Sequence, residues 1–130
     1  MISVRGVTKQ FGGLTAVENL DLDVGRGEVV GFLGPNGAGK TTTMRMLTGV
    51  LEPDQGSIYY DGQLISEDLN AAKKKVGYLP ESNPLYSDML VVEYLEYATS
   101  LRKMNQKDAR SGISDAVDET GISEVFFRPI

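Results

Sequence analysis

The sequence contains no cysteine and no histidine. Without cysteine, the chain can form neither disulfide bonds nor thiolate metal sites. Without histidine, it cannot use an imidazole as a general base, a metal ligand or a charge sensor. Any chemistry must therefore rest on the backbone and on other side chains.

Long apolar runs and strongly basic tracts are missing as well. No run approaches the roughly 18 residues of a membrane-spanning helix, and the first residues lack the apolar core of a signal peptide. The net charge is −5, and the longest basic run, 73–75, is typical of a solvated helix face. We therefore expect a cytoplasmic protein whose main partner is not nucleic acid.

The 130 residues are enough for one compact domain, and 41% hydrophobic and 24% charged residues are ordinary for a folded protein. Apolar residues alternate with polar ones in 19–24, which predicts a half-buried strand after a first short strand near the N-terminus. The segment 11–18 between them contains two glycines and is interpreted as a turn.

Two short, nearly continuous apolar runs, 28–33 and 76–79, are typical of strands buried on both faces of a parallel sheet. The connection 25–27 predicts an antiparallel pairing of the strands on either side of it. Helical spacing predicts a helix over 41–50 and a short one over 69–75, with a strand over 57–60 between them.

Beyond Pro84 the pattern becomes helical. Apolar residues recur at helical spacing over 91–101 and again over 109–117, and Gly121 is placed to end the second helix. We thus divide the chain into a mixed strand-and-helix part, 1–85, and a helical part, 86–130.

The stretch 31–44, GFLGPNGAGKTTTM, contains the pattern G-x-x-x-x-G-K-[ST] of the phosphate-binding P-loop. Its glycines let successive backbone N–H groups point inward, and the following helix adds the positive end of its dipole. Lys40 would bring a positive charge to the β- and γ-phosphates, and the Thr41 hydroxyl can bind Mg²⁺. The predicted nucleotide contacts in this loop are Gly34, Asn36, Gly37, Ala38, Gly39, Lys40, Thr41 and Thr42.

Together with VTKQFGGLTAVENLDLDV before it and LTGVLEPDQGSIYYDG after it, this stretch resembles the N-terminal half of an ATP-binding-cassette (ABC) transporter ATPase subunit. GYLPESNPLY is most similar to the multidrug, ABC-2-type and gliding-motility group of bacterial exporters. The resemblance implies an α/β fold: a P-loop NTPase core with an N-terminal antiparallel β subdomain, followed by the start of the helical subdomain. Domain 1–85 would be the partial nucleotide-binding core, and 86–130 the beginning of the helical subdomain.

The resemblance also implies residue roles. Phe11 occupies the position of the aromatic residue that stacks on adenine, although the commoner residue is tyrosine, and Val17 would pack beside the base. Taken alone, Phe11 would be read as an ordinary core aromatic. Glu81 occupies the position of the glutamine that contacts Mg²⁺ and the attacking water; its alternative is an exposed loop glutamate. Lys40 and Glu81 are thus the catalytic candidates, and Thr41 and Glu81 the metal ligands.

Several elements of that family are missing from the 130 residues. The Asp118-Glu119 pair lies in a helical pattern and is therefore rejected as the Walker B acid and base. No LSGGQ-like signature is present, and the switch histidine is absent with every other histidine. We therefore expect a truncated piece of a longer subunit that binds nucleotide without appreciable turnover, and whose uncovered sheet lowers its stability or drives association.

The resemblance implies the following function for the whole subunit: it binds and hydrolyses ATP with Mg²⁺ to drive export across a membrane. Its expected partners are a second nucleotide-binding subunit in a dimer and an integral membrane permease, on the inner face of the cell membrane. Two alternatives stay open: a soluble ABC-type ATPase acting on ribosomes or DNA, and a nucleotide-binding fragment with no enzymatic task.

Overall fold

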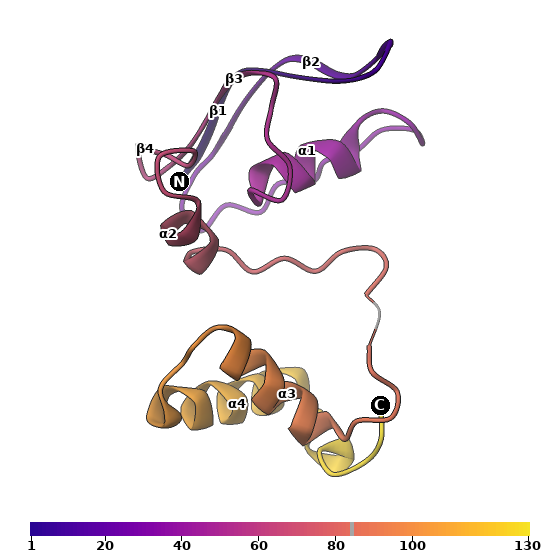
Figure 1. Ribbon diagram of the computed structural model, residues 1–130, viewed down its shortest axis with the longest axis vertical. Helices are drawn as coiled ribbons and strands as arrows, with labels where there is room; N and C mark the ends of the chain where they lie inside the picture. The colour runs from indigo at the N-terminus through magenta and orange to yellow at the C-terminus, as the bar shows by residue number, and fades with distance from the viewer. Residues whose placement is uncertain (84) are drawn as a thin grey trace. The chain divides into compact units, whose positions relative to one another are not determined.

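The structure is a computed structural model that describes residues 1–83 and 85–130 (Figure 1). It divides into two compact units, Met1–Leu79 and Pro80–Ile130, which are described one at a time. The change of pattern predicted at Pro84 falls on the one residue outside the described part of the chain. Reading these units as a nucleotide-binding core and the start of a helical subdomain remains a prediction.

The first unit contains a four-stranded antiparallel sheet in the order β2-β1-β3-β4. Its strands are β1 (Ile2–Phe11), β2 (Leu14–Val24), β3 (Gln55–Tyr60) and β4 (Gln63–Leu64). Two helices accompany them, α1 (Lys40–Leu47) and α2 (Leu69–Lys74). The predicted alternation in 19–24 is confirmed, since Leu20, Leu22 and Val24 are half-buried while the residues between them are exposed.

The core lies between the sheet and the two helices of this unit. Met46 of α1 is only 1% exposed, and Ala72 of α2 packs into the same cluster. The Tyr60 hydroxyl donates a hydrogen bond to the Leu47 carbonyl, which ties β3 to the last turn of α1. The buried members of the cluster are Val4, Val7, Met46, Ile58, Tyr60, Ile65 and Ala72.

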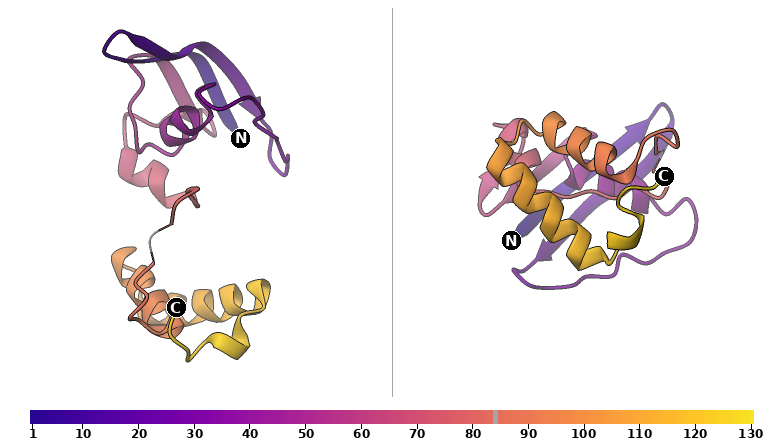
Figure 2. Two further views of the ribbon diagram at one scale, coloured as in Figure 1. Left: turned by 90° about the vertical axis from the view of Figure 1, so that its right-hand side faces the viewer. Right: turned by 90° about the horizontal axis from the view of Figure 1, so that it is seen from below.

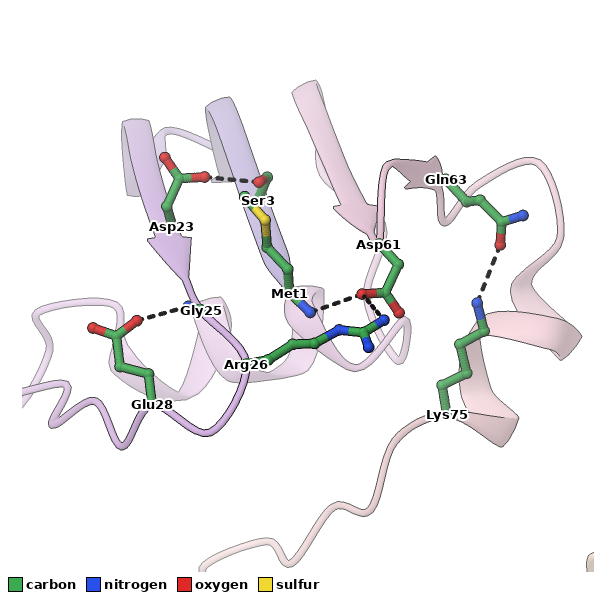
Figure 3. Close-up of polar contacts among 9 residues, drawn as sticks. All are labelled: Met1, Ser3, Asp23, Gly25, Arg26, Glu28, Asp61, Gln63 and Lys75. Atoms are coloured by element: carbon green, nitrogen blue, oxygen red, sulfur yellow. Dashed lines mark hydrogen bonds and ion pairs between the residues drawn. The ribbon is translucent and has the colours of Figure 1, made fainter.

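Charged groups join the ends of the strands (Figure 3). The Asp61 carboxylate, in the turn between β3 and β4, accepts from the Met1 amine at 2.9 Å and from Arg26 at 3.1 Å. The Glu28 carboxylate accepts from the Gly25 N–H at 2.6 Å and closes the turn that follows β2. These contacts fix the point from which the chain runs toward the glycine-rich loop.

Three local predictions were wrong. The segment 11–18 is not a turn: β1 and β2 form one long hairpin in which only Gly12 and Gly13 turn. The runs 28–33 and 76–79 are not strands, and the antiparallel pairing across 25–27 does not form. A strand exists only where a neighbour shares its backbone hydrogen bonds, and within residues 1–83 and 85–130 no strand pairs with either run.

The second unit is helical, as predicted. It contains α3 (Val91–Leu101), α4 (Gln106–Thr120) and the short 3₁₀ helix η1 (Ser123–Val125), with α3 packed against α4 (Figure 2). The Asn105 side chain caps α4 by accepting from the Asp108 N–H at 2.9 Å. Gly121, with φ 67°, ends α4 in the left-handed conformation expected of a helix C-terminus.

Candidate nucleotide-binding site

The glycine-rich loop runs from Gly34 into the N-terminus of α1, as the sequence predicted. Gly37 and Gly39 have φ values of 85° and 83°, a region in which residues with a Cβ are strained. Inside the loop, the Ala38 N–H donates to the Pro35 carbonyl at 3.2 Å, and the Thr43 N–H donates to the Gly39 carbonyl at 2.8 Å. The loop is thus a tight turn that leads into the first hydrogen-bonded turn of the helix.

Lys40 is the first residue of α1, and its ammonium turns back onto the loop. It donates to the carbonyl oxygens of Gly34 at 2.6 Å and Pro35 at 2.7 Å. The positive charge therefore lies at the loop itself and adds to the positive end of the helix dipole there. This combination suits a multiply charged phosphate group.

The hairpin supports the loop from β2. A β-bulge makes Ala16 the extra residue of β2, because Lys9 pairs with Val17 and Gln10 with Thr15. A Cβ placed on Gly39 would lie 2.3 Å from the Ala16 carbonyl oxygen and 3.0 Å from Val17 Cγ2. Val17 of β2 therefore lies close to Gly39, next to the start of α1. Its predicted place beside a bound nucleotide stays a prediction.

Phe11 ends β1 at the turn of the hairpin and is 49% exposed. The alternative interpretation of Phe11 as an ordinary core aromatic is therefore wrong. Its ring is open to solvent, as a ring that stacks on a base must be. Whether it does so stays a prediction.

The two candidate metal ligands lie in different units. Thr41 is in the first turn of α1 and exposed, while Glu81 is an exposed residue of the second unit. Among residues 1–83 and 85–130, no cluster of three or more acidic side chains could hold a metal by itself. The Thr41 hydroxyl fits Mg²⁺ in the usual manner of nucleotide sites, where phosphate oxygens and waters supply most ligands and the protein supplies one or two.

Sequence reasoning missed two contributors to this region. The Ala16 carbonyl lies against the loop at the position of the bulge. The residue types around Ala16 gave no indication that a bulge would form there. Lys9 and Asp54, 45 positions apart, form an ion pair beside Phe11. Neither the spacing nor the periodicity of the sequence could have predicted that these two residues form a pair.

A loop with the pattern G-x-x-x-x-G-K-[ST] that leads into the N-terminus of a helix is typical of P-loop nucleotide-binding proteins. The model of the ABC transporter family matches residues 17–129. The chain therefore belongs to the ABC transporter ATP-binding family.

Three curated relatives illustrate the range of this family. The chain is 38% identical over 124 residues to the uncharacterized ABC transporter ATP-binding protein YhaQ of Bacillus subtilis, covering 95% of this chain and 41% of that protein. It is 34% identical to the sulfate/thiosulfate import ATP-binding protein CysA of Bacillus cereus, covering 91% and 33%. It is 43% identical over 96 residues to the Nod factor export ATP-binding protein I of Ralstonia nicotianae, covering 74% and 30%.

The same fold is found in a solved structure, cbiO1 from Clostridium perfringens, part of the ABC transporter complex cbiONQ. The TM-score is 0.83 at 25% identity, covering 98% of this chain and 53% of that one. The predicted fold class, an antiparallel β subdomain followed by helices as in the N-terminal portion of an ABC ATPase, is thereby confirmed. The chain spans less than half the length of the curated relatives it matches.

Proposed function

We propose that this chain is the nucleotide-binding portion of an ATPase subunit that uses ATP and Mg²⁺ to drive transport across a membrane. The observation that carries the proposal is the position of Lys40, whose ammonium lies on the carbonyls of Gly34 and Pro35 at the helix N-terminus. Lys40 and Thr41 would bind the phosphates and the metal, and Phe11 and Val17 would contact the base. Bound Mg²⁺ would neutralise charge on the phosphates.

Glu81 is proposed as the group that holds a Mg²⁺-bound water. A carboxylate can accept a hydrogen bond from such a water, but it cannot donate one as the amide of a glutamine does. The 130 residues contain no candidate for the general base, so we expect this chain to bind ATP and to turn it over at a negligible rate. Family-like phosphate release by this chain would contradict that expectation.

We further propose that the subunit acts as an exporter. The support is the resemblance of GYLPESNPLY to the multidrug, ABC-2-type and gliding-motility group, together with a relative whose name states export. Import is the competing direction, since another relative is named for sulfate/thiosulfate import. For transport in either direction, the proposed partners are a second nucleotide-binding subunit and a membrane permease. The subunit that contains this chain would lie on the inner face of the membrane.

Within residues 1–83 and 85–130, no helix is long and apolar enough to cross a membrane. The soluble alternative, an ABC-type ATPase acting on ribosomes or DNA, is supported less well because the net charge is −5.

Calorimetric titration with ATP in the presence of Mg²⁺ tests the central proposal. Lys40→Ala removes charge-assisted bonds worth about 1.5–3 kcal/mol, so we expect about tenfold to hundredfold weaker binding. Lys74→Ala is the matched control, because it removes an equal charge from the exposed last turn of α2. Equal affinity of the two variants would overturn the assignment of the loop.

A further inference from the structure

The Lys9 ammonium lies between an aromatic ring and a carboxylate at the end of the β1–β2 hairpin. Lys9 Nζ is 5.7 Å from the centroid of the Phe11 ring, within the range of a cation–π contact. It is also 2.8 Å from Asp54 Oδ1 and 2.8 Å from the Glu52 carbonyl oxygen. The Lys9 side chain is only 12% exposed, although the ring beside it is half open to solvent.

Asp54 fixes this arrangement from the segment that leads into β3. Its second carboxylate oxygen accepts from the Gln10 N–H at 2.7 Å, and its own N–H donates to the Thr8 carbonyl at 2.9 Å. The three bonds made by Asp54 therefore hold the backbone and the side chain that immediately precede Phe11. They hold the part of β1 from which the Phe11 side chain projects.

The cluster is connected to the phosphate loop through one cross-strand pair. Lys9 lies opposite Val17 in the hairpin, and Val17 contacts the position of Gly39 at the start of α1. The end of β1 is thus held in a defined place relative to the loop that would bind the phosphates.

We propose that Lys9 and Asp54 are positioning residues for the base of a bound nucleotide, acting through Phe11. This inference rests on the proposed nucleotide binding. Lys9 would contact the ring and fix it before the ligand arrives, so that binding does not have to immobilise it. A cation near the ring also leaves ring surface available for stacking, since half of Phe11 remains exposed.

The test compares two ligands, ATP and inorganic tripolyphosphate, which carries the phosphates without a base. Lys9→Met keeps the length of the side chain and removes its charge. We expect about twofold to tenfold weaker ATP binding, the range for one newly mobile side chain, and unchanged tripolyphosphate binding. Lys9→Arg keeps the positive charge and should restore ATP binding.

The matched control is Asp23→Asn. It removes another ion pair of the same hairpin, Arg5–Asp23 at 2.7 Å, which lies among the residues at its open end. This control should leave both affinities unchanged. Lys9→Met in a Phe11→Ala background should have no additional effect, because the ring through which it acts is gone.

The inference would be overturned if Lys9→Met weakened the binding of ATP and tripolyphosphate equally. It would also be overturned if Lys9→Met weakened ATP binding as much in the Phe11→Ala background as in wild type. Wild-type protein that binds tripolyphosphate as tightly as ATP would also overturn it while leaving phosphate binding intact. Binding of neither ligand would overturn the proposed function itself. If circular dichroism shows that Lys9→Met is unfolded, Asp54→Asn serves instead, since it removes the charge and keeps a hydrogen-bonding side chain.

Discussion

At position 39, a hydrogen atom is the largest substituent that fits. The Cβ of any other residue would meet the Ala16 carbonyl oxygen at 2.3 Å, a distance that requires the backbone to move. The φ of 83° adds a penalty of about 1–2 kcal/mol for a residue with a side chain. The glycine of the phosphate motif is therefore required here for its contact with β2 as well as for the shape of the loop.

We expect Gly39→Ala to weaken ATP binding by more than about tenfold, because the loop and the hairpin must separate to admit the methyl group. Gly27→Ala is the control: its φ is 72°, but a Cβ there meets no atom within 4 Å. Calorimetric titration with ATP, paired with a thermal melt of each variant, measures both effects. If the two variants bind ATP equally well, the contact with Ala16 does not shape the loop.

At the scale of elements, two carboxylates hold the β1–β2 hairpin at different points. Asp23 accepts from Arg5 and Ser3, and Asp54 accepts from Lys9 and the Gln10 N–H. In each case the cationic partner's hydrogen bond is the main cause of a pKa below the ordinary value of the carboxyl group. Both carboxylates are therefore more acidic in the folded chain than in the unfolded one.

A lowered pKa means that the carboxylate binds fewer protons in the folded state than in the unfolded state. The contribution of each carboxylate to stability is therefore fully present above the unfolded pKa of about 3.9. That contribution is lost as the pH falls through the lower, folded value. We expect the urea midpoint to decrease as the pH falls below about 4, and to decrease less in Asp54→Asn than in wild type. Parallel pH profiles for the two proteins would contradict this account. Salt should weaken the effect, since both pairs are near the surface.

β3 approaches its antiparallel neighbour β1 closely at Gly56, where φ is 83° and a Cβ would lie 2.4 Å from the Gly6 carbonyl oxygen. We expect Gly56→Ala to lower the free energy of unfolding by more than about 2 kcal/mol. Gly62→Ala, at φ 80° with no atom within 4 Å of its Cβ, carries the backbone penalty alone and should cost less. Urea denaturation of both variants provides the comparison, and equal losses would contradict a steric cause.

The sequence predicts elements best where their pattern is local. The alternation in 19–24 depends on one buried face, and the motif at 34–41 carries its own glycines and lysine, so both could be recognised. The runs 28–33 and 76–79 were misjudged because apolar composition predicts burial, while a strand also needs a neighbour to pair with. The Lys9–Asp54 pair could not be predicted, since it depends on how β3 returns to β1.

At the scale of the whole molecule, each of the two units is compact by itself. The first unit, however, leaves several apolar side chains exposed to solvent. In the run 28–33, Val29 is 97% exposed and Leu33 is 93% exposed. Exposed apolar side chains that lie close together in the chain favour association with another chain.

We therefore expect this 130-residue chain to associate in a concentration-dependent way, and the double variant Val29→Glu, Leu33→Glu to shift the equilibrium toward monomer. Ser66→Glu with Asn70→Glu, both at exposed polar positions, is the control, because it adds the same two negative charges without removing exposed apolar side chains. Sedimentation velocity over a range of concentrations measures the shift. A wild-type chain that is monomeric throughout would show that these side chains do not drive association.

The bulge at Ala16 also determines where the chain can change its length. Deleting Ala16 would leave Lys9 opposite Val17 and Gln10 opposite Thr15, but it would remove the carbonyl oxygen that lies against Gly39. An insertion at the same point would carry the carbonyl away from Gly39. Insertions and deletions should therefore be tolerated at the Gly12-Gly13 turn, where a Cβ meets no atom within 4 Å, and rejected a few residues later.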